Sequence, residues 1–390
     1  MRISQRASRI APFYVMEMAK AASALAQQAR GSDKPMVFLN IGEPDFTAPP
    51  LVQEAAVRAI HQGRTQYTQA LGLDRLRERI SGWYTTRFGV NVPARRIVVT
   101  AGASAALQLA CLALIEAGDE ILMPDPCYPC NRQFVQAADG RAVLLPTDAA
   151  QRFQLSAAQV AAHWNAHTRG VLLASPSNPT GTSIAFDELK RIHHIVSDKG
   201  GITMVDEIYL GLSYDASFGQ TALAIDDNII SINSFSKYFN MTGWRLGWLV
   251  APEGYVEAID RIAQNIFLAA STPAQYAALA AFEPETLALL EARRDEFRAR
   301  RDFLLPALRG LGFGVPQIPQ GAFYIYARSA ELASDSYVFA RELLENVGVA
   351  VTPGIDFGAN AAQEQLRFAY TVPVDQLGEG VDRIARFLKR

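Results

Sequence analysis

One lysine of this sequence stands in a segment suited to amine chemistry. Lysine is scarce, with six lysines among the 37 basic residues, and Lys237 follows an apolar stretch that is typical of a buried strand. Its surroundings read S-F-S-K-Y-F-N-M-T-G-W-R-L-G, with Ser234 and Ser236 before it and Arg245 eight positions after it. A lysine just past a strand end can lose solvation, which lowers its pKa and makes its amine a nucleophile toward carbonyl groups. A surface lysine in a turn is the alternative.

An acidic residue and a phenol follow a second apolar segment. Asp206 comes late in the run G-G-I-T-M-V-D-E-I-Y, and Tyr209 stands three positions beyond it. A lone buried carboxylate is costly, so an aspartate in this place favours a cationic partner. In an open parallel sheet, ligands bind at the carboxyl ends of the strands. Capping of a helix or turn by Asp206 is the alternative.

Two turns that follow apolar segments offer further polar groups. Residues 175–181, S-P-S-N-P-T-G, form a turn restricted by two prolines and a glycine, and the amide of Asn178 can both donate and accept. Residues 100–107, T-A-G-A-S-A-A-L, join a predicted strand to a predicted helix, so backbone N–H groups at the helix start could hold a phosphate. This loop has neither the Walker A pattern nor the G-x-G-x-x-G pattern. Each turn alone is weak evidence.

Alternating strands and helices would position these groups. The strands are predicted at residues 97–100, 120–124, 141–146, 170–175, 202–207, 228–234 and around Trp248–Val250. Helices are predicted at residues 105–117, ended by Gly118, and at residues 186–200. Strands too apolar to face water, separated by helices, indicate a mostly parallel sheet covered on both faces. The four polar places lie where strands meet turns, so they can converge at one edge of this α/β sheet.

After Pro273 the pattern changes to that of a smaller α+β unit. Residues 284–311 predict a long charged helix that Pro306 bends or interrupts. The remaining elements are predicted as a strand at 322–327, a helix at 336–348, strands at 349–353 and 365–371, and a terminal helix near 374–390. We expect two domains, a large α/β domain over residues 46–285 and a small α+β domain formed by residues 1–45 and 286–390.

Composition argues against several classes of protein. The 390 residues are 49% hydrophobic and 19% charged, which indicates a folded globular chain, and the net charge of −2 gives no electrostatic footprint for nucleic acid. No stretch of about 18 apolar residues predicts a membrane span. The start of the chain lacks the apolar region of a signal peptide. Three cysteines, an odd number, fit a reducing compartment, so we expect a cytoplasmic protein.

An amine, an acid, a phenol, an amide, an arginine and a phosphate cradle together fit pyridoxal phosphate. In the order and spacing of its motifs, the chain resembles the class I and II (fold type I) pyridoxal-phosphate aminotransferases over essentially its whole length. The motifs are G-E-P-D-F at 42–46, S-N-P-T-G at 177–181, D-E-I-Y at 206–209 and S-F-S-K-x-x-x-M-T-G-W-R-x-G at 234–247. The resemblance implies a large domain with a mostly parallel seven-stranded sheet between helices, plus a smaller α+β domain.

The resemblance also implies roles for the catalytic residues. Lys237 would form the Schiff base with the cofactor and move the proton of the substrate Cα. Asp206 would pair with the pyridine nitrogen, and Asn178 and Tyr209 would hydrogen-bond the ring 3′-oxygen.

Further residues match cofactor and substrate contacts of that family. The phosphate would be held by helix-start amides, a hydroxyl and a guanidinium, from Ala103, Ser104, Ser234 and Arg245. Tyr128 would stack on the cofactor ring, and Tyr67 would reach the phosphate of the neighbouring subunit, which implies a homodimer. Arg367 would clamp the substrate α-carboxylate, with Asn178 and the backbone of Gly42 beside it.

The implied activity is transfer of an amino group from an L-amino acid to a 2-oxo acid by ping-pong half-reactions. One alternative on the same scaffold is another pyridoxal-phosphate reaction, such as β-elimination or cyclisation, because fold does not determine the reaction. A remote alternative is a non-catalytic ligand sensor. Residues 100–107 contain no lysine, which disfavours a dicarboxylate substrate and favours an apolar or aromatic one.

No metal site is predicted. Cys127 and Cys130 form C-Y-P-C, but no second pair or nearby histidine completes a zinc set. His163 and His167 lack the glutamate of a zincin motif and are interpreted as part of a surface helix. The aromatic run at 322–327 is interpreted as a packed strand, with a substrate pocket as the alternative.

Overall fold

Seven short segments form one sheet, and six of them are buried along most of their length, whereas the edge strand β4 is only partly buried. The computed structural model describes residues 3–4, 7–8, 10, 14–28 and 35–389. The strands are β2 (Ile97–Thr100), β3 (Glu120–Asp125), β4 (Arg141–Pro146), β5 (Thr168–Ala174), β6 (Ile202–Asp206), β7 (Ile230–Ser234) and β8 (Gly247–Val250). Their order is β2-β8-β7-β6-β5-β3-β4, with β3 to β7 parallel and β8 antiparallel to both neighbours. The predicted seven-stranded, mostly parallel α/β sheet is confirmed.

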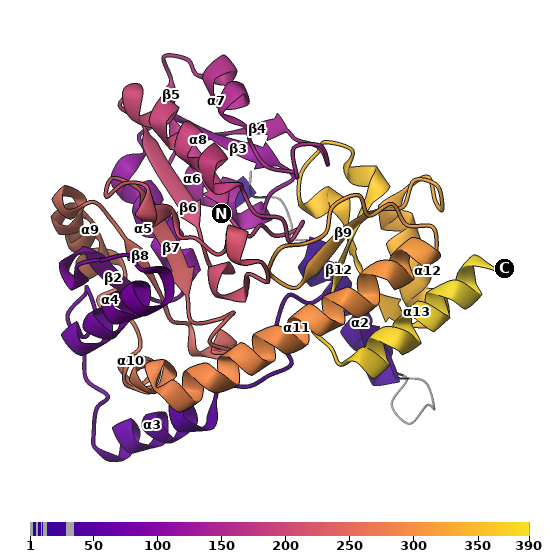
Figure 1. Cartoon of the computed structure of the whole chain (residues 1–390), viewed down its shortest axis with the longest axis horizontal. Helices are drawn as coiled ribbons and strands as arrows, with labels where there is room; N and C mark the ends of the chain where they lie inside the picture. The colour runs from indigo at the N-terminus through magenta and orange to yellow at the C-terminus, as the bar shows by residue number, and fades with distance from the viewer. Residues whose placement is uncertain (1–2, 5–6, 9, 11–13, 29–34, 390) are drawn as a thin grey trace.

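Alternate residues of the central strands pack in opposite directions, as the strand period of two requires. Ile121 and Leu172 belong to one buried cluster with helix α5 (Ala103–Leu114) and α9 (Glu253–Ile266). Their neighbours Leu122, Val171 and Leu173 belong to a second cluster with α7 (Ala157–His163) and α8 (Phe186–Asp198). Figure 1 shows the sheet with helices on both faces. The other helices of this part are α3 (Pro50–His61), α4 (Asp74–Phe88), α6 (Pro129–Ala137) and α10 (Thr272–Leu279).

Two small sheets lie beside the large one (Figure 1), and one of them joins segments from both ends of the chain. One sheet has the antiparallel order β11 (Thr352–Pro353), β12 (Gln365–Ala369) and β9 (Tyr324–Arg328). The other pairs β1 (Val37–Phe38) in parallel with β10 (Val349–Ala350). The helices around these sheets are α2 (Tyr14–Gln28), α12 (Ser336–Val347) and α13 (Val374–Leu388).

The proposed division into domains at 45/46 and 285/286 stays a prediction. Residues 1–2, 5–6, 9, 11–13 and 29–34 of its N-terminal part lie outside the described residues.

Three predicted elements differ from the structure. The helix expected at 105–117 ends at Leu114, because Ile115 takes an extended, buried conformation. The helix at Pro284–Gly310, α11, continues through Pro306 instead of being interrupted there. Pro306 is exposed, so water can satisfy the carbonyl that the proline leaves without a donor. The single strand expected at 349–353 is two strands in two sheets, because β10 and β11 pair with different partners.

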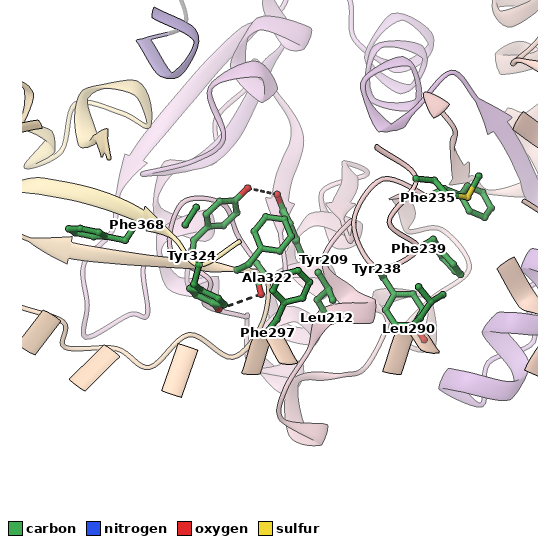
Figure 2. Packing of buried hydrophobic residues seen from close by; sticks show 14 of the residues in the cluster. Tyr209, Leu212, Phe235, Tyr238, Phe239, Leu290, Phe297, Ala322, Tyr324 and Phe368 are labelled. Carbon is green, nitrogen blue, oxygen red and sulfur yellow. Dashed lines mark hydrogen bonds between the residues drawn. The ribbon is translucent and has the colours of Figure 1, made fainter. Parts of the chain in front are cut away.

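An aromatic core connects the large sheet with the small ones. Figure 2 shows the buried rings of Tyr209, Phe235, Phe297 and Tyr324 in this cluster. The ring of Phe323, next to Tyr324, lies 5.4 Å from the rings of both Tyr209 and Phe297. Rings at this separation gain packing energy beyond their area. The loop after β6 is therefore fixed against the small sheet.

One buried ion pair holds α11 to the segment after β1. The side chain of Arg300 is 1% exposed, and its two terminal nitrogens each lie 2.9 Å from a carboxylate oxygen of Asp45. Glu296 accepts a further hydrogen bond from the same guanidinium at 2.9 Å. Bidentate pairs of this kind are strong, and removal of one partner leaves a buried charge poorly compensated.

We predict that Asp45→Ala lowers stability by about 2–4 kcal/mol, because the Arg300 guanidinium loses its bidentate partner. The measurement is the apparent melting temperature, which should fall by several degrees. The matched control is Glu364→Ala, because Glu364 pairs with Arg328 at the surface and exposed pairs contribute about 1 kcal/mol or less. Equal melting temperatures for the two variants would contradict the assigned role of Asp45.

Candidate active site

Three neighbouring parallel strands end at one cavity. Its volume is about 530 Å³, and its lining includes Ala174, Asp206 and Ser234, the last residues of β5, β6 and β7. These strands are too apolar to face water, so polar side chains appear only where each strand gives way to a turn. The carboxyl edge of the sheet is the expected ligand site of an open α/β fold.

Lys237 reaches this cavity from the turn after β7. Its Nζ donates a hydrogen bond to the carbonyl oxygen of Gly42 at 2.7 Å. The same atom lies 5.9 Å from the ring of Tyr209 and 5.7 Å from the ring of Phe323. Burial of the ammonium group is the main cause that lowers the pKa of Lys237 to about 8. About a tenth of this amine is therefore neutral and nucleophilic at pH 7, far more than for an exposed lysine.

Asp206 is a buried acid without a cationic partner at bonding distance among the described residues. Within the described part of the chain, this carboxyl accepts one hydrogen bond, from the backbone N–H of Ile208 to Oδ1 at 3.1 Å. Burial is the main cause that raises the pKa of Asp206 to about 7. The site therefore has a place for a ligand group that carries a proton or positive charge against this carboxyl.

The start of α5 and Arg245 form an anion cradle. Ala103 and Ser104 open the helix, where backbone N–H groups lack intrahelical partners. Gly102, just before the helix, has a φ of +84°, which favours glycine, and Nη2 of Arg245 comes within 2.7 Å of the place that a Cβ would take. Nη1 of Arg245 donates to the Thr242 carbonyl at 3.0 Å, which leaves other donors of the guanidinium for a ligand. This cradle suits a phosphate group.

Arg367 stands on β12 at another side of the cavity and is 2% exposed. Its Nη1 donates to Oδ1 of Asn178 at 2.8 Å, and its Nη2 donates to the carbonyl of Asn40 at 2.7 Å. The guanidinium lies over the rings of Tyr324 at 4.4 Å and Phe357 at 4.9 Å. Its Nε is buried without a hydrogen-bond partner. A buried guanidinium with an unused donor fits a carboxylate ligand.

Two tyrosines meet between Lys237 and Arg367. The hydroxyls of Tyr209 and Tyr324 lie 2.8 Å apart (Figure 2). A Cβ on Gly42 would lie 2.0 Å from the Tyr324 hydroxyl, so this tyrosine requires glycine opposite it. Tyr128 reaches the cavity from the start of α6, and burial raises its pKa well above that of a free phenol.

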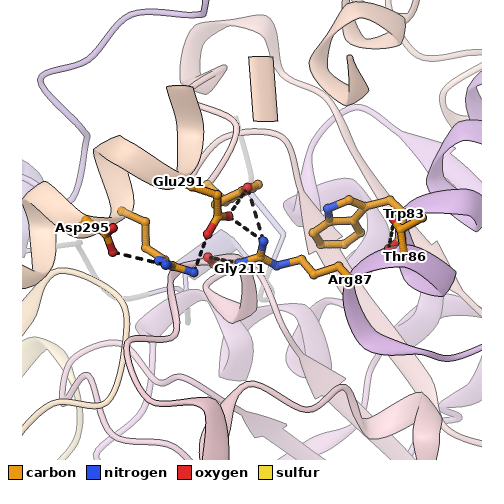
Figure 3. A network of polar contacts seen from close by, with 8 residues as sticks. Trp83, Thr86, Arg87, Gly211, Glu291 and Asp295 are labelled. Carbon is orange, nitrogen blue, oxygen red and sulfur yellow. Dashed lines mark hydrogen bonds and ion pairs between the residues drawn. The ribbon is translucent and has the colours of Figure 1, made fainter. Parts of the chain in front are cut away.

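A polar network fixes the segment beside Lys237. The hydroxyl of Tyr238 donates to Oε1 of Glu291 on α11 at 2.5 Å. Arg87 of α4 donates to the same oxygen at 2.5 Å and to the carbonyl of Gly211 at 3.2 Å (Figure 3). The turns after Asp206 and after Ser234 are thereby tied to two helices.

The structure brings all but one of the predicted site residues to this cavity. The residues that line it are Gly42, Ala103, Ser104, Tyr128, Asn178, Asp206, Tyr209, Ser234, Lys237, Arg245 and Arg367. Tyr67 lies outside it, is 84% exposed, and lines a separate surface depression with Arg64 and Tyr276. A single chain therefore leaves open the predicted contact of Tyr67 with a neighbouring subunit.

Sequence reasoning missed several lining residues. Tyr324 lies in the aromatic run that was interpreted as a packed strand, and it is both strand and cavity wall. Val15, Met16 and Ala19 of α2 also line the cavity, and no motif pointed to them. The cysteines Cys127 and Cys130 are free. Within the described ranges no group of three metal-ligating side chains occurs, and no helix combines the length and hydropathy of a membrane span.

Comparisons with known proteins agree on one family. The model for "Aminotransferase class I and II" matches residues 34–384. The valine–pyruvate aminotransferase of Mycobacterium tuberculosis is 37% identical over 389 residues, which cover 99% of this chain and 98% of that protein. A crystal structure of an aminotransferase from M. tuberculosis has a TM-score of 0.94 at 36% identity, covering 100% and 99% of the two chains. Aspartate aminotransferase from Thermus thermophilus with maleate has a TM-score of 0.92 at 30% identity, covering 99% and 100%.

We predict that the amine of Lys237 reacts with a small aldehyde along a pH profile whose midpoint is near pH 8. The neutral amine is the nucleophile, so the rate rises with pH and levels off above the pKa. The measurement is reductive alkylation of dialysed protein with acetaldehyde and cyanoborohydride, followed by peptide mass mapping. In Lys237→Ala, the alkyl label should disappear from the peptide that contains residue 237 and from no other peptide. A labelling rate at Lys237 that still climbs steeply above pH 9 would contradict the lowered pKa.

Proposed function

The chain belongs to the class I and II aminotransferase family, and we propose that it transfers an amino group from an L-amino acid to a 2-oxo acid with pyridoxal 5′-phosphate as its cofactor. The transfer would proceed in two half-reactions of the ping-pong type. The observation that carries this proposal is the shared cavity of Lys237, Asp206 and Arg367. An amine with a lowered pKa, a buried acid and a buried guanidinium that line one space support this proposal.

The residues of the cavity fit the cofactor at each of its functional groups. Asp206, which lacks a cationic partner at bonding distance among the described residues, would hold the protonated ring nitrogen. The start of α5 and Arg245 would hold the phosphate, with Ser234 beside them. Asn178 and Tyr209 would contact the ring oxygen, and Tyr128 would stack on the ring face. When bound, pyridoxal phosphate supplies an electron sink that makes the Cα proton of an amino acid acidic.

Lys237 supplies the proton-transfer group. Its amine is held by the Gly42 carbonyl at 2.7 Å and is surrounded by buried side chains. A pKa near the working pH allows an amine both to accept a proton and to return it. We infer that Lys237 moves the proton of the substrate Cα.

Arg367 orients the substrate. Its unpartnered Nε and the fixed direction of its guanidinium favour a carboxylate that lies against it in the cavity. Asn178 contacts Arg367 and lines the cavity, so it would border both substrate and cofactor. The clamp and Lys237 together would present the substrate Cα to the amine.

We also propose a cytoplasmic homodimer. The exposed phenol of Tyr67 and its place outside the cavity of its own chain support a contact with the cofactor phosphate of a second copy. The odd number of cysteines supports a reducing compartment.

The experiment that tests the function is a panel of the twenty amino acids, each added singly to protein loaded with pyridoxal phosphate. We expect some of them to bleach the visible band of the cofactor and to yield equal amounts of 2-oxo acid and pyridoxamine phosphate. Release of ammonia without consumption of a 2-oxo acid would instead indicate an elimination reaction. No spectral change with any amino acid would contradict the proposal.

Lys237→Ala should lower kcat by about 10³-fold or more, because the proton of the substrate Cα then lacks its acceptor. The measurement is the rate of 2-oxo acid formation at saturating donor. The matched control is Lys190→Ala, since Lys190 lies on the surface of α8 with half of its side chain exposed. This control should keep the rate of the unchanged protein, and retained turnover in Lys237→Ala would exclude the assigned role.

Tyr67→Phe should weaken the binding of pyridoxal phosphate by about tenfold, because a hydrogen bond to a charged group is lost. Dissociation constants come from titration of cofactor-free protein, and sedimentation equilibrium gives the mass of the assembly. Tyr255→Phe changes another exposed tyrosine and serves as the control. A monomeric protein, or equal affinities in the two variants, would contradict the proposed contact.

A further inference from the structure

We propose that helix α2 forms an apolar wall for the side chain of the substrate and that Asp356 is a positioning residue that holds this wall. The proposal rests on the function proposed above and names its substrate class, amino acids with an uncharged aliphatic side chain. It follows from three features of the described residues, the lining of the cavity, its charges and the cap of α2.

The lining has an apolar side that the cofactor contacts leave unused. Val15, Met16 and Ala19 come from the first two turns of α2, at the spacing that places residues on one helix face. The same cavity is lined by Ile41, Leu107 and Ile208. Met16 is 52% exposed in this chain. An aliphatic group against such a surface would remove apolar area from water, which is worth about fourfold in affinity per buried methylene.

The charges of the cavity disfavour a second carboxylate on the substrate. Of its described lining residues, the cations are Lys237, Arg245 and Arg367, and each has a task in the proposed function. The lining also includes Glu43, whose carboxylate accepts a hydrogen bond from Thr242 at 2.6 Å. A distal carboxylate would meet this negative group without a further cation of the same chain to pair with it.

Asp356 caps the beginning of α2. Its two carboxylate oxygens accept hydrogen bonds from the backbone N–H groups of Tyr14 at 2.8 Å and Val15 at 2.5 Å. These N–H groups have no intrahelical partner, so an acid is favourable there. Asp356 is itself buried, and its carbonyl accepts from Arg132 at 2.8 Å. Asp356, 341 residues away in the sequence, therefore holds the beginning of the wall, while Met18 and Ala22 of the same helix pack into the main core.

The same short segment also supports the substrate clamp. Phe357, next to Asp356, lies under the guanidinium of Arg367 at 4.9 Å and packs in one buried cluster with Val15. Residues 356 and 357 thus set the position of the apolar wall relative to the carboxylate clamp. Asp356 does not line the cavity, so it acts through α2 and not on the reacting atoms.

The first test compares substrates of the holoenzyme. We expect kcat/KM to rise about tenfold from alanine to norvaline, which adds two methylenes, and to be at least tenfold lower for aspartate and glutamate than for norvaline. Calorimetry adds a readout that needs no turnover, with 4-methylpentanoate expected to bind at least tenfold more tightly than succinate.

Each result of this comparison has a defined meaning. A preference for the dicarboxylates in either measurement would overturn the inference and indicate a cation from a second copy of the chain. Absence of turnover with every amino acid would contradict the proposed function, and the calorimetry would still decide whether the wall is apolar.

The second test changes the wall and its cap. Met16→Arg should lower the norvaline-to-glutamate ratio of kcat/KM at least tenfold, because it adds a cation to the wall. Val338→Arg adds the same charge to an equally exposed position of α12 and should leave the ratio as it is. Similar ratios in these two variants would overturn the placement of the wall.

Asp356→Ala should reduce the norvaline-to-alanine ratio of kcat/KM about tenfold, mainly through the KM of norvaline, and Asp356→Asn should retain part of the ratio. The matched control is Asp335→Ala, because Asp335 caps α12 through the N–H groups of Tyr337 and Val338 at 2.8 and 3.0 Å. It should lower the melting temperature without changing the ratio. If kcat/KM fell equally for norvaline and alanine in Asp356→Asn, Asp356 would have only a structural role, and its positioning role would be overturned.

Discussion

The burial of ionisable groups at the carboxyl edge of the sheet is the constraint on which the site depends. Lys237 and Asp206 stand at the ends of neighbouring parallel strands, and removal from water moves the pKa of each group toward neutrality, to about 8 and about 7. Neither shift arises from an ion pair between the two residues. The sheet thus holds an amine that can lose its proton beside an acid that favours a positively charged ligand.

Two arginines, Arg245 and Arg367, line the same cavity as Lys237 and Asp206 and are suited to bind anions. The glycine before α5 lets Arg245 approach the helix start, and the rings and polar groups around Arg367 fix that guanidinium while its Nε has no partner among the described residues. In the proposed function, a phosphate at one place and a carboxylate at the other would orient the ligands so that the reacting atoms lie near Lys237.

Packing between the sheets makes these positions stable. The aromatic core around Tyr209 and Phe323 joins the turn after β6 to β9, and Glu291 joins the turn after β7 to α4 and α11. The N-terminal helix α2 is held by the cap from Asp356, by the small apolar cluster around Val15, and by Met18 and Ala22 in the main core.

The periodicity and turn chemistry of the sequence determined the seven strands and five of the described α-helices, α5, α8, α11, α12 and α13, because these are local properties. The resemblance of its motifs to a known family pointed to the other predicted residues that meet in the cavity. The sequence did not determine that α5 ends at Leu114 or that residues 349–353 divide between two sheets, because these depend on which partner each segment meets. Only the tertiary structure placed Tyr324, α2 and Asp356 at or beside the site, since contacts across hundreds of residues leave no periodic signal.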